Sequence, residues 1–334
     1  MAALSWERVT HRLREPLQTA FGTLRERQTL VVTLESADGS CGVGEAAPLE
    51  PYDGVSLAAV EAALTAYRQA IAGLDDGAQI LGACQAAAGL PQALAAIDIA
   101  LWNRTARREG ARVCDLLGDR PLDAVPVNAT IGALQPEAAG LAAASAVAAG
   151  FSCVKVKVGS GDDLGRLAAV RAAGPGLAIR IDANGAWTPD QAIGVLPTLA
   201  SAAGGLEIVE EPVHGRAELR AVAAALPGLR IASDESGPSA TGTVCLKLSR
   251  SGGISALLAQ AAHVRADGRE VYLASTFDGP VGIAAAVHAA AALGVELPCG
   301  LATLDAFAEG PPAALRPRQG AIAVPSGSGL GVDS

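Results

Sequence analysis

The fold is decided by a recurring pattern whose first copy is Cys153-Val-Lys155-Val-Lys157-Val-Gly159, a short run in which apolar and charged side chains alternate. Four similar runs follow it, at residues 179–184, 206–212, 231–236 and 244–249, and in each an apolar stretch leads to a charged residue: in turn Asp182, Glu210, Asp234 and Lys247. Each run has the length of a β-strand, and Ala-rich segments long enough for a helix separate most of them. The pattern therefore predicts alternating strands and helices.

This region is predicted to close into a barrel. Strands joined through helices run parallel, with right-handed crossovers. Runs that start near residues 125, 153, 179, 206, 231, 244, 271 and 297 make about eight strands, which favours a βα barrel over an open doubly wound sheet. No Gly-x-Gly-x-x-Gly fingerprint follows a strand, so a nucleotide-binding sheet is not indicated. Only 12 residues (235–246) separate Asp234 from Lys247, and we expect a loop there instead of a helix.

The first 120 or so residues have a different organisation. Alternation at 29–34, a turn at 37–40 and a second run at 42–45 predict an antiparallel sheet. Periodic Ala- and Leu-rich segments at 55–74 and 90–108 predict helices. We therefore expect an α+β unit over residues 1–120, a barrel over 121–310, and a C-terminal segment, about 311–334, that returns to complete the first unit.

Composition and charge exclude several classes of function. The 334 residues carry a net charge of -9, with 25 Lys+Arg against 34 Asp+Glu, so no nucleic-acid partner is expected. Six scattered cysteines without C-x-x-C spacing indicate neither a disulfide framework nor a zinc site. The longest apolar run, 281–295, is shorter than the roughly 18 residues that span a bilayer, and the N-terminus does not read as a signal peptide. We expect a soluble, cytoplasmic protein with no membrane partner. The sequence leaves its oligomeric state unknown.

Three acidic residues end successive strands of the predicted barrel. The carboxyl ends of barrel strands converge at one mouth, where Asp182, Glu210 and Asp234 would meet. Carboxylates held that close repel one another and require a hard cation. Oxygen ligands alone favour Mg²⁺, with Mn²⁺ as a substitute. Any one acid, or the neighbouring Glu211, has an alternative as a helix cap; the regular spacing of all three is what predicts a metal site.

Lysines flank this predicted metal site. Lys155 and Lys157 point to the same face because side chains alternate along a strand. Two neighbouring ammonium groups would lower each other's pKa, which would provide a neutral amine as a base. Lys247 comes from a strand across the barrel, so a substrate would have a lysine on each face. This arrangement suits removal of a proton α to the carboxylate of a small molecule.

At these residues the chain resembles the enolase superfamily, specifically its muconate-cycloisomerase-like branch, which carries a K-x-K motif and a second Lys on the sixth strand. Gly42-Val-Gly44-Glu45-Ala-Ala-Pro48 is similar to the capping-domain signature of that branch. The resemblance implies a modified (β/α)7β TIM-like barrel with an N-terminal α+β capping domain. It also implies that Mg²⁺ binds Asp182, Glu210 and Asp234, and that Lys157 and Lys247 are catalytic.

The C-terminal stretches 275–285 and 297–305 resemble the o-succinylbenzoate synthase family, as does the run 182–189. That resemblance implies Mg²⁺-dependent dehydration of 2-succinyl-6-hydroxy-2,4-cyclohexadiene-1-carboxylate in menaquinone biosynthesis. In this sequence Asp278 stands where the family commonly has Glu. The secondary site candidates, which would support the lysines or contact substrate, are Lys155, Asn184, Ser275, Thr276 and Gly300. A lid over the barrel mouth is expected from residues 21–23 and 50–54, where Phe21 and Tyr52 could equally be packing residues.

Two other functions stay open. A dipeptide epimerase or N-acylamino acid racemase would use Lys157 and Lys247 as two opposed acid/base groups. Dipeptide epimerases usually carry an Asp-x-Asp pair near the last strand, where this chain has Gly300-Leu-Ala-Thr303. A non-catalytic barrel that serves as a binding module is the third alternative, and failure to bind Mg²⁺ would favour it.

Overall fold

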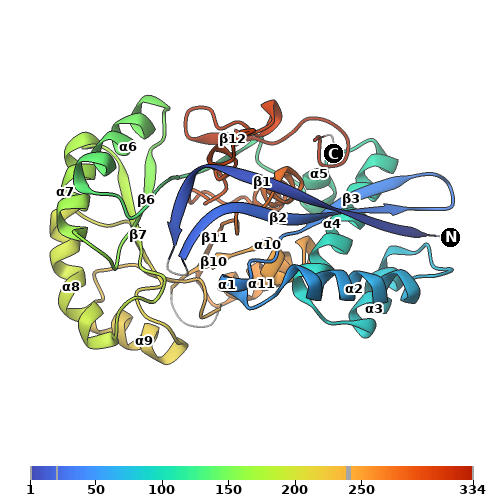
Figure 1. Ribbon diagram of the computed structural model, residues 1–334, viewed down its shortest axis with the longest axis horizontal. Coiled ribbons are helices and arrows are strands. Elements are labelled where there is room, and N and C mark those ends of the chain that lie inside the picture. Colours follow the sequence, from blue (N-terminus) through green and yellow to red (C-terminus); the bar gives the residue numbers. More distant parts are fainter. Residues whose placement is uncertain (1, 20–21, 238–241, 333–334) are drawn as a thin grey trace.

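The computed structural model describes residues 2–19, 22–237 and 242–332, which form an N-terminal α+β unit beside a barrel (Figure 1). The N-terminal unit contains an antiparallel sheet in the order β1-β2-β3 and a set of helices. Its strands are β1 (Ala3–Thr19), β2 (Gly22–Glu35) and β3 (Cys41–Ala46). Its helices are α1 (Glu50–Asp53), α2 (Leu57–Ala70), α3 (Gly77–Ala87), α4 (Pro91–Glu109) and α5 (Val113–Leu117).

The predicted sheet and the two predicted helices of this unit are confirmed, the helices as α2 and α4. Helix α3 was not predicted, because it buries only Ile80 and Cys84 and so shows no broad apolar stripe. The segment 50–54, expected as a loop, begins with the short helix α1. The β1–β2 hairpin is long, and it reaches from the helices of this unit across to the barrel (Figure 1).

The glycines of the Gly42-Val-Gly44-Glu45 motif let β3 lie directly against α4. A Cβ atom on Gly42 would lie 1.9 Å from the carbonyl oxygen of Ala100, and one on Gly44 would lie 1.9 Å from that of Ala96. No side chain fits at those distances, so both positions require glycine. The motif therefore specifies close packing between the sheet and the helix, and it places Glu45 at the boundary with the barrel.

The barrel contains seven parallel strands in the order β11-β10-β9-β8-β7-β6-β5. They are β5 (Ala129–Ile131), β6 (Cys153–Lys157), β7 (Ala178–Asp182), β8 (Ile208–Glu210), β9 (Ile231–Ser233), β10 (Thr243–Leu246) and β11 (Glu270–Leu273). The connecting helices are α6 (Pro136–Ala148), α7 (Asp163–Ala173), α8 (Pro189–Ala202), α9 (Arg216–Ala225), α10 (Leu248–Ser251), α11 (Ile254–Ala266) and α12 (Pro280–Ala292).

A short eighth segment closes the ring. Cys299 bridges to Val127 and Gly300 bridges to Ala274, both in parallel orientation, so this segment hydrogen-bonds to the chain on either side of the gap. The predicted α/β architecture, a (β/α)7β barrel with a separate α+β unit, is thus confirmed. In the described part of the chain no helix lies between β9 and β10, as expected for so short a connection.

Two predicted segments differ in detail. The strand expected over 125–131 is two short strands, because β4 (Ala124–Pro126) pairs antiparallel with β12 (Ala321–Ala323) and only β5 enters the barrel. The C-terminal segment therefore contacts the start of the barrel through β12. It also reaches the N-terminal unit, where the Val113 amide donates to the Gly329 carbonyl at 3.0 Å. The short 3₁₀ helices η1 (Leu304–Ala306) and η2 (Ala313–Leu315) lie on this return path.

Because side chains alternate along each strand, the outer face of the sheet, which the helices cover, is apolar, and the barrel interior is polar. On β6, Val154 and Val156 are fully buried and join the apolar cluster beneath α6–α9. The alternate side chains, Lys155 and Lys157, therefore point into the barrel. Among the described residues no helix is long and apolar enough to cross a membrane.

Candidate active site

Strand register brings the predicted charged residues together. Lys157 pairs with Asp182 across β6 and β7, and Asp182 pairs with Glu210 across β7 and β8. Glu210 pairs with Ala232, so Asp234 follows two residues later on the same face, just past the end of β9. One lysine and three acids from four adjacent strands thus lie at the carboxyl end of the barrel.

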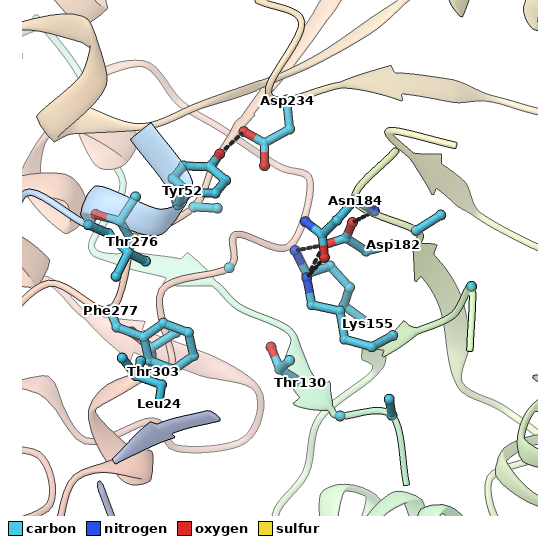
Figure 2. Close-up of a pocket in the computed structure, with 18 of the residues that line it drawn as sticks. Leu24, Tyr52, Thr130, Lys155, Asp182, Asn184, Asp234, Thr276, Phe277 and Thr303 are labelled. Carbon is cyan, nitrogen blue, oxygen red and sulfur yellow. Dashed lines mark hydrogen bonds and ion pairs between the residues drawn. The ribbon is translucent and has the colours of Figure 1, made fainter. Parts of the chain in front are cut away.

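These ends line a cavity of about 380 Å³ between the barrel and the N-terminal unit (Figure 2). From the N-terminal unit come Gly22, Thr23, Leu24, Leu49, Pro51 and Tyr52. From the barrel come the charged residues Lys155, Lys157, Asp182, Asp234 and Lys247. Uncharged barrel residues complete the wall, including Thr130, Asn184, Ser160, Ser275, Thr276, Phe277, Gly300 and Thr303. Glu210 is fully buried and lies outside this lining set.

Asp182 lies between two ammonium groups. Its Oδ2 atom is 2.9 Å from Nζ of Lys155 and 2.5 Å from Nζ of Lys157. Lys155 also reaches Oε1 of Glu210 at 2.9 Å. The charges of the two lysines hold the pKa of Asp182 below its usual range although burial acts in the opposite direction.

Lys247 pairs with Asp234 on the other side of the cavity. Lys247 Nζ lies 2.5 Å from Asp234 Oδ2 and donates to the Tyr52 hydroxyl at 2.5 Å. That hydroxyl in turn donates to Asp234 Oδ1 at 3.1 Å, and Arg250 donates to it at 3.0 Å. Tyr52 therefore links the N-terminal unit directly to the predicted catalytic and metal-binding residues.

Glu210 and Glu211 have different surroundings. Glu210 points into the barrel, whereas Glu211 accepts hydrogen bonds from the Asp234 amide at 2.7 Å and the Ser236 amide at 2.9 Å. The Ser236 hydroxyl also donates to Glu211. Glu211 holds the loop that carries Asp234, and its φ of 39° marks the turn that directs the two neighbouring carboxylates apart.

The donor set fits a hard divalent cation. Asp182, Glu210 and Asp234 are 1%, 0% and 4% exposed, so their charge requires cationic partners, which lysine ammonium groups provide here and which a metal ion would supplement. The ligand atoms of Glu210, Asp234 and Cys245 lie within 4.8 Å of one another. Burial raises the pKa of the Cys245 thiol well above its usual range. A hard cation such as Mg²⁺ prefers oxygen donors, which here are the carboxylates.

The lowering of the pKa that was expected from a neighbouring lysine is not found at Lys155. Burial alone would lower the pKa of Lys155, but Asp182 and Glu210 outweigh it and raise that pKa well above its usual range. The pKa of Lys247 is raised in the same way, because Asp234 outweighs the effect of burial. Each of these ammonium groups contacts a carboxylate directly, and that contact dominates over repulsion between lysines.

Asn184 and Glu235 extend the network behind Lys157. Asn184 accepts from Lys157 Nζ at 2.7 Å and donates to Glu235 Oε1 at 2.9 Å. Its φ of 45° is one that Asn tolerates better than most residues. Burial and the neighbouring Asp234 raise the pKa of Glu235 to about 8. Sequence reasoning identified Asn184 but not Glu235, which stands next to Asp234 without a motif of its own.

Tyr272 supports Glu210 from inside the barrel. Its hydroxyl donates to Glu210 Oε2 at 2.5 Å, and the guanidinium of Arg180 lies 4.9 Å from the centre of its ring. Arg180 is fully buried and pairs with Glu207 at 2.6 Å. Sequence reasoning missed Tyr272 because only the register of β11 shows that its side chain faces Glu210 and the other acids predicted to bind metal.

Most of the other residues that were predicted to lie near the substrate line the cavity. Ser275, Thr276 and Gly300 line the cavity, as predicted, and so do Gly22, Thr23 and Tyr52 of the expected lid. Phe21 lies outside the described residues. Asp278, which stands where the o-succinylbenzoate synthase family commonly has Glu, is 3% exposed and accepts from the Thr276 hydroxyl at 2.6 Å, so it supports the wall of the cavity.

Comparison with known proteins identifies the family. Residues 137–334 match the enolase C-terminal domain-like family, and residues 3–118 match the mandelate racemase/muconate lactonizing enzyme N-terminal domain. The chain therefore belongs to the enolase superfamily, in its muconate-cycloisomerase-like branch.

Individual relatives include enzymes of different reaction types. The hydrophobic dipeptide epimerase of Enterococcus faecalis (strain ATCC 700802 / V583) is 32% identical over 213 residues, which cover 61% of this chain and 59% of that protein. The o-succinylbenzoate synthase of Thermobifida fusca (strain YX) is 39% identical over 201 residues, 54% of this chain and 60% of that protein. Each alignment thus spans about three-fifths of the relative's length.

The fold comparison extends over nearly the whole chain. The crystal structure of the dipeptide epimerase from Enterococcus faecalis V583, complexed with Mg and the dipeptide L-Leu-L-Tyr, superposes with a TM-score of 0.90 at 27% identity. The superposition covers 98% of both chains. These matches establish that the chain is an enzyme of this superfamily, and the relatives that they include catalyse different reactions.

Proposed function

We propose that this chain is an o-succinylbenzoate synthase, a lyase that dehydrates 2-succinyl-6-hydroxy-2,4-cyclohexadiene-1-carboxylate to 2-succinylbenzoate in menaquinone biosynthesis. The observation that carries the proposal is the distribution of charge in the cavity. Every charged side chain among the described lining residues belongs to the acid and lysine cluster. Where a dipeptide ammonium would require a carboxylate, this chain has Gly300 and Thr303. The similarity to the Thermobifida enzyme supports the same reaction.

In this proposal Asp182, Glu210 and Asp234 hold Mg²⁺, with Mn²⁺ as a substitute. The cation, when bound, supplies charge neutralisation at the substrate carboxylate. The uncharged part of the cavity would take the succinyl arm, whose polar groups can accept hydrogen bonds from hydroxyl donors such as Ser275 and Ser160. Hydroxyl groups can donate hydrogen bonds to the polar groups of the arm, so this part of the cavity needs no charged side chain.

Lys157 and Lys247 would share the proton chemistry from opposite sides. Lys157, with its side chain 30% exposed, faces the cavity and would take the proton α to the ring carboxylate. Lys247, whose pKa is raised by Asp234, stays protonated and stabilises the negative charge that develops. Lys157 would then return the proton to the departing hydroxyl, so that one water leaves and the ring becomes aromatic.

The second candidate is a dipeptide epimerase or N-acylamino acid racemase. It is favoured by the position of Lys157 and Lys247 on strands across the barrel from each other and by the similarity to the Enterococcus enzyme. A racemase uses both lysines as acid and base in turn, so the substrate α-proton should exchange with solvent, and replacing either lysine should abolish racemisation. In the dehydratase Lys247 provides charge alone.

The test is a spectrophotometric assay of the purified protein with Mg²⁺ and the cyclohexadiene carboxylate, in which loss of the diene absorbance is followed. Conversion that EDTA abolishes and Mg²⁺ restores is the expected result. Binding of Mg²⁺ without conversion would overturn the dehydratase assignment, and deuterium exchange into dipeptides and N-acyl amino acids would then test the isomerases. Failure to bind Mg²⁺ at all would support the non-catalytic alternative. A cytoplasmic location remains a prediction, which fractionation of the source cells would test.

A further inference from the structure

Cys245 places a sulfur atom among the acids of the site. It lies on β10 two residues before Lys247, so both side chains point into the barrel. Its Sγ atom and carboxylate oxygens of Glu210 and Asp234 all lie within 4.8 Å of one another. The three residues are 5%, 0% and 4% exposed. The cluster therefore combines one thiol and two carboxylates in a buried position.

The thiol of Cys245 has no hydrogen-bond partner among the described residues, although it is surrounded by polar groups. Two other buried thiols of the barrel differ, because Cys153 contacts Glu207 at 3.5 Å and Cys299 contacts the Leu297 carbonyl at 3.6 Å. A buried polar side chain without a partner requires an explanation, and a bound ion is one such explanation. Apolar packing would be served as well by Ala or Val, neither of which can bind a metal.

We propose that Cys245, Glu210 and Asp234 form a binding site for a thiophilic divalent cation, with Zn²⁺ as the representative ion. One thiolate and two carboxylates match the three protein ligands, with one open position, that Zn²⁺ takes in open sites. The site shares Glu210 and Asp234 with the proposed Mg²⁺ site, so the two cations exclude each other. It does not depend on which reaction the enzyme catalyses.

Metal binding at this site requires the three ligand atoms to come closer together. Zn–S and Zn–O bonds of about 2.3 and 2.0–2.2 Å place tetrahedral ligand atoms roughly 3.5 Å apart. The ligand atoms here lie within 4.8 Å of one another, so metal binding requires them to move closer and requires Glu210 and Asp234 to exchange their contacts with Lys155 and Lys247 for the cation. The thiol proton is released to solvent as the metal–sulfur bond forms. Zn²⁺ binds mixed sulfur and oxygen donors more tightly than Mn²⁺ does, whereas Mg²⁺ has little affinity for sulfur.

Cysteine spacing in the sequence could not reveal this site. The three ligands come from β8, the loop after β9, and β10, and only the barrel brings them together. The consequence for the enzyme is inhibition: a thiophilic cation would occupy two of the acids that the proposed Mg²⁺ site requires.

Metal titration of the full-length protein tests the proposal directly. Cd²⁺ is the spectroscopic probe, because cadmium–thiolate bonds absorb in the ultraviolet, and Zn²⁺ affinity is measured by calorimetry. Wild type should show one equivalent of the cadmium–thiolate band. Cys245→Ser should lose that band and weaken Zn²⁺ binding by at least about 10-fold. The matched control is Cys41→Ser, which removes the half-exposed thiol and should leave both measurements unchanged.

The readouts do not involve turnover, so they are independent of the proposed reaction. A cadmium–thiolate band that persists in Cys245→Ser, or one that is absent from wild type, would overturn the proposal. Should Cys245→Ser fail to fold, Cys245→Ala and a competition experiment on wild type replace it. In that competition, increasing Mg²⁺ should reduce the cadmium–thiolate band, and a band insensitive to saturating Mg²⁺ would show that the cation binds elsewhere.

Discussion

Replacing Tyr272 with Phe should weaken Mg²⁺ binding without unfolding the protein. The Tyr272 hydroxyl donates to Glu210 at 2.5 Å, and both side chains are at most 1% exposed. A hydrogen bond to a charged group contributes about 1.5–3 kcal/mol, and its loss leaves a buried carboxylate oxygen without this donor. Supporting bonds of this kind change metal affinity by about 10–100-fold. Phe keeps the ring that Arg180 contacts, so the packing inside the barrel is retained.

Isothermal titration of Mg²⁺ into wild type and Tyr272→Phe measures this effect, with circular dichroism as the check on folding. Tyr67→Phe is the matched control, because the Tyr67 hydroxyl also donates over 2.5 Å, to the Ala88 carbonyl in the N-terminal unit. The control should lose stability and keep its Mg²⁺ affinity. A folded Tyr272→Phe protein with the wild-type dissociation constant would refute the reasoning, as would an equal loss of affinity in Tyr67→Phe.

Other predictions test separate parts of the molecule. Lys157→Ala should reduce turnover by at least about 10²-fold while Mg²⁺ binding persists, and near wild-type turnover would rule out its role as the base. Glu45→Gln should alter the pH dependence of stability, because burial and the nearby Asp278 raise the pKa of Glu45 to about 7 from 4.5. The folded state keeps a proton that the unfolded state releases, so wild-type stability should fall by roughly 3 kcal/mol as pH rises from about 4.5 to about 7. Denaturant unfolding at pH 5 and pH 8 should show this fall in wild type and a smaller one in the variant; equal falls would contradict the assignment. Gly44→Ala should cost about 1–3 kcal/mol or more, because its Cβ would lie 1.9 Å from the Ala96 carbonyl oxygen. Gly82→Ala, in open space on α3, should be neutral or stabilising, and an equal loss of stability in the two variants would contradict the packing argument.

Local sequence patterns were enough to predict a βα barrel and the charged residues at its strand ends, and the family resemblance added the (β/α)7β form. Strand alternation assigned Lys155 and Lys157 to one face, and the repeated apolar run followed by an acid located Asp182, Glu210 and Asp234 at strand ends. These signals are short in range, because they depend on the two-residue period of a strand and on the convergence of parallel strands at one mouth. The limit of such reasoning is visible at 125–131, where pairing with β12, nearly 200 residues away, splits the expected strand.

The electrostatic state of the site depended on the tertiary structure. From the sequence, Lys155 and Lys157 were expected to repel each other, whereas the folded chain sets Lys155 against two carboxylates and raises its pKa. The side chains that support the acids were also hidden, because Tyr272 and Glu211 become partners only through strand register and a turn. By itself the sequence determined on which strands the charged residues of the site lie, since that property follows from local periodicity. Only the tertiary structure decided which charged groups contact one another and how Cys245 and Tyr52 join the site. The physical reason is that Coulomb and hydrogen-bond energies depend on distances between segments that are far apart in the sequence.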